Sequence, residues 1–347
     1  MRRRQFAWRG PGCGARSRAF PCVMSSSNAP HPQRTQALLM LLVANFCWGL
    51  SFPLIKSVLL LHERIIPEAG TWFSAIYTVA PRFFLALLVL LALKPRAWRG
   101  ATRGELKQGL VIGLFASAGM LLQNDALQFT AASTSAFLTQ FYAILIPVYV
   151  AVRARRNPGV RVWLSCALVL AGVAILGRFD WRQLHLGRGE WETLLASVFF
   201  MGQILWLEKK EFAANRAFEL TLVMFATEAL VFAVLAGATA PSVAALIVPW
   251  TSPVWLGFTV TLTVVCTLGA FGLMNAWQPK ITATEAGLIY CVEPIFGSVA
   301  ALFLPAIFSA WALINYPNEL ATWTLLVGGG LITAANILIQ LKPTGKG

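Results

Sequence analysis

The chain has 347 residues, of which 57% are hydrophobic and 12% are charged, and its mean hydropathy is +0.67. Its 14 acidic and 28 basic side chains are too few to cover the surface of a water-soluble protein of this length. The composition therefore excludes a soluble enzyme, a disordered protein and a disulfide scaffold, and indicates a chain that lies in lipid. The six cysteines contain no Cys-x-x-Cys pair, so we expect neither a zinc site nor a redox site.

Ten apolar segments follow one another along the chain, each close to the roughly 20 residues with which a helix crosses a bilayer. They cover residues 37–60, 72–93, 108–128, 131–152, 160–177, 191–207, 220–237, 254–277, 282–303 and 321–341. Two further apolar stretches, 243–250 and 304–313, are too short to span and contain proline, so we interpret them as surface-lying or re-entrant connections. We predict an all-α integral membrane protein with ten transmembrane helices, with twelve helices as the alternative.

The basic residues indicate how these helices are oriented. With the amino terminus in the cytoplasm, the predicted inner segments carry 22 Lys and Arg residues and the outer segments carry 4. Because basic residues are retained on the cytoplasmic side, this distribution predicts that both termini are cytoplasmic. The net charge of +14 is then explained by topology, and we expect no nucleic-acid partner.

Residues 1–36 are basic, rich in Ser, Pro and Gly, and without helical periodicity. We expect a disordered cytoplasmic segment there. The following apolar run is long enough to remain as a span and has no small-residue cleavage site after it, which disfavours a signal peptide. A start at Met24 and an Arg-rich transit peptide are the alternatives.

A weak internal repeat recurs at a spacing of 150 to 151 residues. The segment "LQNDALQFTAASTSAFL" from Leu122 resembles "LMNAWQPKITATEAGLI" from Leu273, which places Asn124 on Asn275. Five helices in each half would give the two halves opposite orientations in the membrane, a construction typical of secondary transporters. We therefore predict two inverted five-helix repeats, over residues 37–178 and 190–341.

Five strings in this order resemble the EamA family of the drug/metabolite transporter superfamily, from Gln36 to Leu341. They are "NFCWGLSFPLIK", "APRFFLALLVLLAL", "ALQFTAASTSAFL", "TEAGLIYCVEPIFGSVAAL" and "NELATWTLLVGGGLITAANIL". The chain departs from the family pattern at Arg153, Arg155 and Arg156, where a Gly-Glu turn is frequent, and in the long segment 304–318. The resemblance implies that helices 1 to 4 and 6 to 9 line a central cavity, with helices 5 and 10 outside.

Three charged residues fall near the bilayer midplane, where a charge costs about 2.5 to 3.5 kcal/mol on insertion scales. They are Arg82, Glu228 and Glu293. Arg82 suits an anionic substrate group, because a guanidinium binds a carboxylate with two hydrogen bonds, and the structural alternative is an ion pair with Glu293. Glu293 precedes Pro294 and is a candidate proton-coupling acid, as is Glu228, for which the sequence suggests no partner.

Neutral polar and aromatic residues lie in the same predicted helices. As candidate substrate-binding residues we take Asn45, Trp48, Asn124, Gln140, Tyr142, Gln203, Trp206, Asn275 and Tyr290, together with Arg82. For each of them the alternative is helix packing or anchoring at the membrane interface. Tyr142 occupies the repeat position of Glu293, which places both near the axis that would relate the halves. Gly172, Gly177 and Gly328 to Gly330 suit close helix packing or homodimerisation.

These features favour a secondary transporter that moves a small organic solute by alternating access. The resemblance implies export of an amino acid or a related metabolite, with proton coupling or exchange as the energy source. No GxxxxGK[ST], HExxH or GxSxG motif occurs, so we expect no ATP-driven transport, no enzymatic activity and no cofactor or metal. An intramembrane enzyme and a channel or scaffold subunit are the alternatives. The expected location is a bacterial cytoplasmic membrane, with an organellar membrane as the alternative.

Overall fold

The structure is a computed structural model that describes residues 31–153, 155, 159–176, 186–281, 286 and 289–340. The described residues form helices joined by turns and contain no strand. The ends of the first predicted repeat, near residue 178, and of the second, at residue 341, lie outside these ranges, as does most of the predicted amino-terminal segment. The first helix begins at His31, six residues before the predicted span.

Seven helices of the described part are long and apolar enough to cross a membrane. Five of them are single elements: α1 (His31–Ile65), α2 (Thr71–Leu93), α3 (Arg103–Ala126), α8 (Ala217–Thr239) and α13 (Glu293–Ala312). The other two are composite, one made of α4 (Ala132–Thr139) with α5 (Tyr142–Arg153), the other of α10 (Pro253–Thr261), η4 (Leu262–Gly269), α11 (Ala270–Trp277) and η5 (Gln278–Lys280).

Three further helices complete the bundle. α6 (Val160–Leu176) and α14 (Trp323–Gln340) are apolar but shorter, and α7 (Arg188–Leu207) has 20 residues with a charged first turn. Short helices lie in the connections: η1 (Trp98–Gly100), η2 (Lys210–Phe212), α9 (Val243–Ile247) and η3 (Val248–Thr251). The predicted connection at 243–250 is therefore helical but too short to span. The interpretation of 304–313 as a connection is wrong, because α13 continues through Ala312 despite Pro305.

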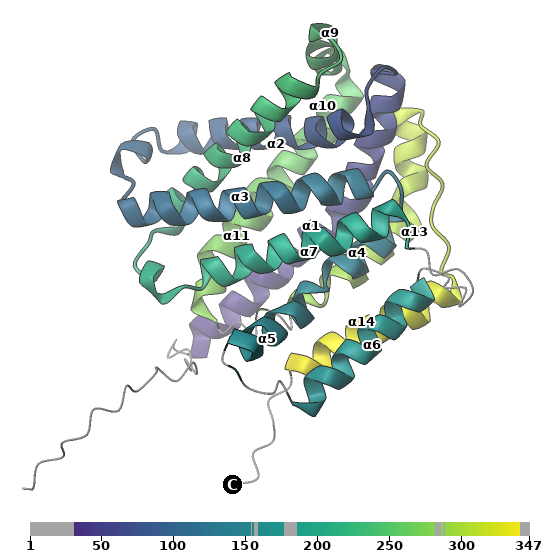
Figure 1. The fold of residues 1–347 in the computed structure, drawn as a ribbon. Coiled ribbons are helices and arrows are strands. Elements are labelled where there is room, and N and C mark those ends of the chain that lie inside the picture. The colour runs from purple at the N-terminus through teal and green to yellow at the C-terminus, as the bar shows by residue number, and fades with distance from the viewer. Residues whose placement is uncertain are drawn as a thin grey trace, which may run out of the picture.

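The helices pack as two groups with α2 and α8 between them. α7 packs on α3 and α4, while α1 packs on α11 and α13. α2 contacts α8, and α6 lies beside α14 at one edge of the bundle (Figure 1). At that edge a Cβ on Gly172 would lie 2.7 Å from the Gly328 carbonyl oxygen, so the two backbones meet at a distance only glycine permits.

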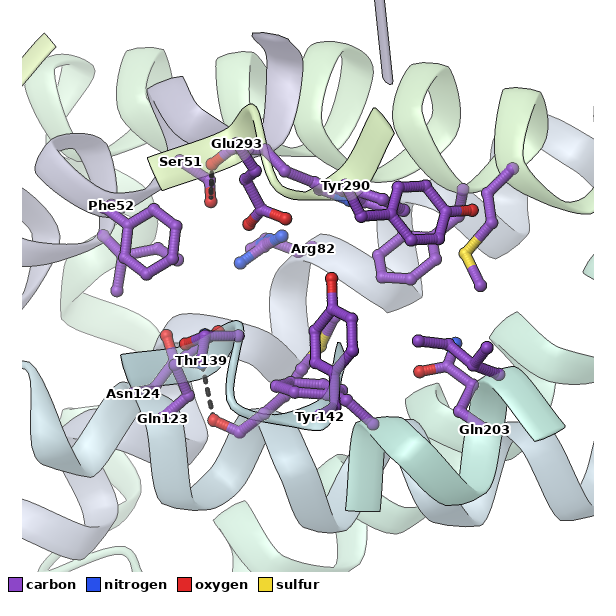
Figure 2. Close-up of a pocket in the computed structure, with 17 residues that line it drawn as sticks. Ser51, Phe52, Arg82, Gln123, Asn124, Thr139, Tyr142, Gln203, Tyr290 and Glu293 are labelled. Carbon is purple, nitrogen blue, oxygen red and sulfur yellow. Dashed lines mark hydrogen bonds between the residues drawn. The ribbon is translucent and has the colours of Figure 1, made fainter. Parts of the chain in front are cut away.

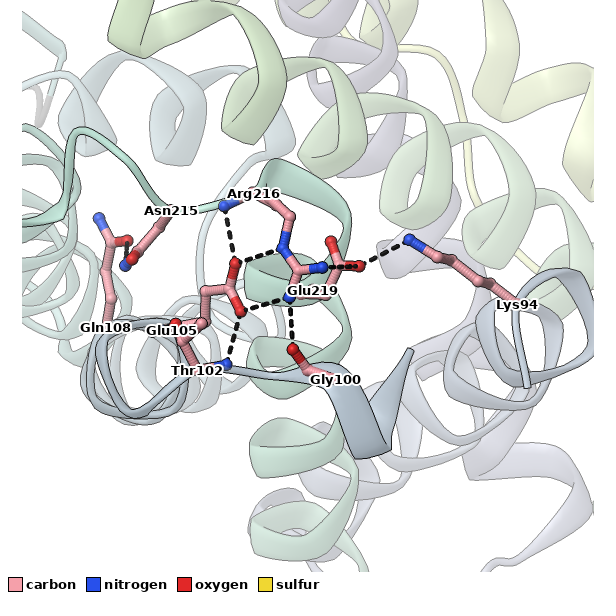
Figure 3. Close-up of polar contacts among 8 residues, drawn as sticks. All are labelled: Lys94, Gly100, Thr102, Glu105, Gln108, Asn215, Arg216 and Glu219. Carbon is pink, nitrogen blue, oxygen red and sulfur yellow. Dashed lines mark hydrogen bonds and ion pairs between the residues drawn. The ribbon is translucent and has the colours of Figure 1, made fainter. Parts of the chain in front are cut away.

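One end of the bundle, where α2 and α7 finish and α3 and α8 begin, carries many lysines and arginines; we call it the basic end. There the buried Glu105 accepts hydrogen bonds from the backbone nitrogen, Nε and Nη2 of Arg216 at 2.8 to 2.9 Å. Glu219 pairs with Arg216 at 3.2 Å and with Lys94 at 2.6 Å (Figure 3). Thr102 and Glu105 form a capping box at the start of α3. These contacts tie the turn after α2 to the turn after α7.

At the opposite end, which we call the far end, polar side chains join the start of α4 to its neighbours. Lys56 of α1 donates to the carbonyl oxygen of Thr130 at 2.5 Å, and the Thr130 hydroxyl donates to Glu190 at 2.6 Å. The carboxylate of Glu319 accepts from the backbone nitrogen of Ala132 at 2.8 Å and from the hydroxyl of Ser133. The Glu319 carboxylate thus accepts from amides at the start of α4 that have no partner within the helix.

Candidate functional site

The helical pattern breaks at two places near the centre of the bundle. In the first half, α4 ends at Thr139 and α5 restarts at Tyr142. In the second half, a turn at 291–292 precedes α13, which starts at Glu293. Tyr142 and Glu293 are 151 residues apart, which is the spacing of the sequence repeat. At each break the backbone changes to tighter turns, in which the amide of Ala143 donates to the carbonyl of Gln140 at 2.9 Å and that of Ile295 donates to the carbonyl of Val292 at 3.0 Å.

A cavity of about 80 Å³ lies beside these two interruptions. Its lining comes from α1, α2, α3, α7 and α11 and from both sides of the two interruptions (Figure 2). The lining residues are Trp48, Ser51, Phe52, Ile55, Arg82, Met120, Gln123, Asn124, Thr139, Tyr142, Phe200, Gln203, Ile204, Phe271, Met274, Tyr290 and Glu293. A mainly apolar lining with a few polar groups is typical of a site for a small organic molecule, and the volume in this conformation is smaller than the roughly 300 to 1,000 Å³ of open ligand pockets.

Arg82 lies in the middle of α2, where it is almost fully buried. Its Nε and Nη2 donate to the Thr267 hydroxyl at 3.3 and 3.1 Å. Thr267 belongs to η4, a π-helical segment whose wider turn lets the same hydroxyl donate to the Leu262 carbonyl five residues back. The guanidinium thus lines the cavity while it donates to a neutral hydroxyl, and its charge also interacts electrostatically with the buried carboxylate of Glu228.

Glu293 stands in the first turn of α13, followed by Pro294. A proline at this position costs no helical hydrogen bond, because the first amides of a helix have no partner within it. The Glu293 carboxylate accepts a hydrogen bond at 3.1 Å from the amide of Gln140, which lies in the other interruption. The positive end of the helix dipole favours a negative charge at this place.

Arg82 and Glu293 both line the cavity but form no ion pair with each other or with any other described residue. The structural alternative considered for Arg82, an ion pair with Glu293, is therefore wrong in this conformation. Instead, the guanidinium of Arg82 donates to Thr267 from Nε and Nη2, and one carboxylate oxygen of Glu293 accepts from Gln140.

Seven of the twelve candidate residues line the cavity: Trp48, Arg82, Asn124, Tyr142, Gln203, Tyr290 and Glu293. Gln140 stands behind Glu293 as its hydrogen-bond donor. The remaining four lie elsewhere. Asn45 donates to the Leu41 carbonyl of its own helix, Asn275 donates to Thr221 of α8, and Trp206 packs on Phe212 near the basic end. Glu228 is buried in α8, and neither carboxylate oxygen has a hydrogen-bond partner among the described residues.

Several lining residues were not selected from the sequence, among them Ser51, Phe52, Thr139, Phe200 and Met274. One signal could have identified Thr139, because it stands 151 residues before Tyr290, as Tyr142 does before Glu293. The apolar members could not have been separated from ordinary packing residues, since any helix of this protein contains many of them. The described part of the chain brings no three His, Cys, Asp or Glu residues together as a metal site would require.

Comparisons with known proteins agree with this picture. Residues 35–178 match the model of the EamA-like transporter family. A search of curated proteins gives no match. Among solved structures, one crystal structure of a protein matches with a TM-score of 0.56 at 16% sequence identity, over 88% of this chain and 96% of its own. This likeness concerns the fold alone. The match over residues 35–178 supports an assignment of this multi-pass membrane protein to the EamA-like transporter family of the drug/metabolite transporter superfamily.

Proposed function

We propose that the protein is a secondary transporter that moves a small zwitterionic solute, such as an amino acid or a related metabolite, by alternating access. The observation that carries the proposal is the placement of Arg82 and Glu293 on one cavity without a mutual ion pair. A carboxylate of the solute would bind Arg82, and its ammonium group would bind Glu293. The aromatic rings of Trp48, Phe271 and Tyr142 would contact its apolar part.

The packing of the helices supports two inverted five-helix repeats and therefore ten spans. Exchanging the halves converts the pair α1–α13 into α7–α5, and α1–α11 into α7–α3. It converts α2–η4 into α8–α3, while α2–α8 and α6–α14 remain as they are. Each of these pairs is in contact. A twofold relation between halves is the arrangement in which rocking of one group of helices opens the two ends in turn.

The charge distribution supports the orientation of the carrier. The basic end collects lysines and arginines from the turns after α2, α7 and α11, including Lys94, Arg99, Lys209 and Lys280. We place this end in the cytoplasm of a cell, with both termini on that side and export as the direction of transport. The solute reaches the cavity from one end at a time.

Competition at Glu293 would couple transport to protons. One carboxylate binds either a proton or the ammonium group of the solute, so exchange of the two across the membrane follows from a single site. Glu228 is a second proposed coupling acid, because its buried carboxylate has no hydrogen-bond partner among the described residues. The direction of the proton gradient would then decide the direction of net solute movement.

Reconstituted liposomes test the proposal. We expect efflux of labelled amino acids that depends on a pH gradient, and loss of this dependence with retained exchange in Glu293→Gln. Glu228→Gln is measured in the same way. Arg82→Ala should abolish uptake of zwitterions while sparing analogues without a carboxylate. Arg99→Ala and Glu68→Gln change exposed charges outside the cavity and serve as controls. Absence of any solute-dependent flux, or site variants indistinguishable from these controls, would refute the carrier.

A further inference from the structure

Two hydrogen bonds connect the cavity to the basic end. Tyr290 lines the cavity, and its hydroxyl donates to Oε1 of Gln278 at 2.6 Å. The other side of the same amide, Nε2, donates to Oε1 of Glu208 at 3.3 Å. Gln278 is fully buried in η5, and Glu208 directly follows the last residue of α7. The contact therefore joins the end of α7 to the turn after α11, and so joins the two helix groups that enclose the cavity.

A contact of the same kind closes the far end. There Lys56 of α1 meets Thr130, in the turn after α3. In the arrangement of two inverted halves, α7 is the counterpart of α1, and α11 is the counterpart of α3. Lys56 stands 152 residues before Glu208, within one residue of the spacing between Tyr142 and Glu293. The two contacts thus occupy equivalent places at opposite ends of the cavity, one through a cation and the other through an acid.

No described cation forms an ion pair with Glu208, although several ionisable groups lie on the elements that meet there. Lys107 of α3 and Lys209 stack on the ring of Trp206, and both lie within ion-pair distance of Glu211. Lys280 of η5 stacks on Trp277. The phenol of Tyr290, behind Gln278, is a further ionisable group there. Among the described residues, the side chain that donates to the Glu208 carboxyl group is a neutral amide.

We propose that Glu208 is the gate residue of the basic end, and that release of its proton to water on that side opens the cavity there. The proposal rests on the carrier function above and adds a regulated gate to it. A neutral Glu208 stays in its half-buried place against Gln278 and holds α7 to the turn after α11. An ionised Glu208 without a cationic partner is stabilised by water, which it reaches when α7 and η5 separate.

The ionisation behaviour of Glu208 agrees with this geometry. Burial raises the pKa of Glu208 to about 7, and the hydrogen bond from Gln278 acts in the opposite direction. A group whose pKa is higher in the closed state than in the hydrated state favours closure when protonated. Closure is therefore favoured below about pH 7, and opening is favoured as the pH rises through this value. Modest changes of the cytoplasmic pH around this value therefore alter the charge of Glu208.

Accessibility of the cavity tests the gate without any transported solute. A Ser51→Cys reporter, conservative in size, is placed in the cavity of a protein whose six native cysteines are alanine. Oriented liposomes then receive a membrane-impermeant methanethiosulfonate on either face. At each pH the labelling rate of the reporter protein with Glu208 is compared with that of its Glu208→Gln variant, so that the pH dependence of thiol chemistry cancels. We expect equal labelling rates of the two proteins near pH 5.5. Near pH 8.5 the Glu208→Gln variant should label at least fivefold more slowly, and only when the reagent is added on the side of the basic end.

Two further variants make the result decisive. Glu211→Gln removes an exposed acid from the same turn and should label like the parent protein at every pH. Gln278→Met removes the amide that bridges Tyr290 and Glu208 and should label quickly on the basic face at every pH. A rate ratio independent of pH, or an equal effect on both faces, would overturn the gate. The assay measures labelling and needs no solute flux, so it separates the two proposals. If labelling does not depend on Glu208 but flux persists, only the gate is refuted. If labelling depends on Glu208 but no flux occurs, only the carrier function is refuted.

Discussion

The side-chain amide of Gln140 donates a hydrogen bond to the carboxylate of Glu293, 153 residues further along the chain, and so joins the two points at which spanning helices restart. Gln140→Leu should leave that buried carboxylate oxygen without a partner and lower the unfolding free energy by about 1 to 3 kcal/mol. Thermal unfolding in detergent measures the loss. The double variant Gln140→Leu/Glu293→Leu should be closer to the parent protein, because both polar partners are then absent. Additive losses would contradict a direct interaction.

Thr267 positions Arg82, and its removal should affect solute binding more than folding. Thr267→Val keeps the shape of the side chain but removes the acceptor for two guanidinium donors. We expect the half-saturating concentration of a zwitterionic solute to rise at least about tenfold, because a hydrogen bond to a charged group contributes about 1.5 to 3 kcal/mol. Thr263→Val removes a buried hydroxyl that donates within the same segment and does not contact Arg82. Equal effects of the two substitutions would exclude a role for Thr267 in orienting Arg82.

The contact between α6 and α14 depends on Gly172. Gly172→Ala would place a methyl group 2.7 Å from the Gly328 carbonyl oxygen, so the helices would have to separate. Overpacking of this kind costs about 1 to 3 kcal/mol. Gly330→Ala adds a methyl group that meets nothing within 4 Å and serves as the matched control. Thermal unfolding should show a lower Tm for the first variant and an unchanged or higher Tm for the second. The packing inferred at this edge is wrong if both variants unfold alike.

Arg216 should contribute more to stability than the exposed charges around it. Arg216→Met removes two side-chain hydrogen bonds to the buried carboxylate of Glu105 and the contact with Glu219. The backbone nitrogen of residue 216 still donates to Glu105. We expect a lower Tm and faster proteolysis of the turn after α7. Glu211→Gln breaks only exposed pairs and should change neither, since such pairs contribute little.

Stability should depend on pH through Glu208. Its pKa is raised by burial to about 7, above the value of about 4.3 expected in an unfolded chain. Between these values the folded protein holds the proton more tightly than the unfolded one, so the unfolding free energy falls as the pH rises and levels off above about 7. Chemical unfolding across this range, compared with Glu208→Gln, isolates the contribution. The substitution should reduce the decrease of the unfolding free energy with rising pH. If the decrease is unaltered, groups other than Glu208 cause it.

The sequence by itself determined that this is a membrane protein, and its motifs pointed to the EamA-like family that residues 35–178 match. Apolar segments of sufficient length require helices, because lipid offers no partner to backbone amides, and this constraint is local. Most predicted spans therefore coincide with helices of the structure. The end of the ninth predicted helix was placed too early, at residue 303, because Pro305 suggested a break. In the structure α13 continues through Pro305 to Ala312. The spacing of 151 residues also identified Tyr142 and Glu293 as corresponding positions before their common place at the helix restarts was known.

Only the tertiary structure decided which polar residues meet. The sequence placed Arg82 and Glu293 at the same depth, but depth does not fix the direction of a side chain around a helix. The partners of Arg82 and Glu293, Thr267 and Gln140, are neutral residues of segments far away in the chain. Glu208 stands at a helix end, where a charge is ordinary, and its importance comes from burial against Gln278. Pairing and burial are properties of packed helices, and a pattern along one helix does not contain them.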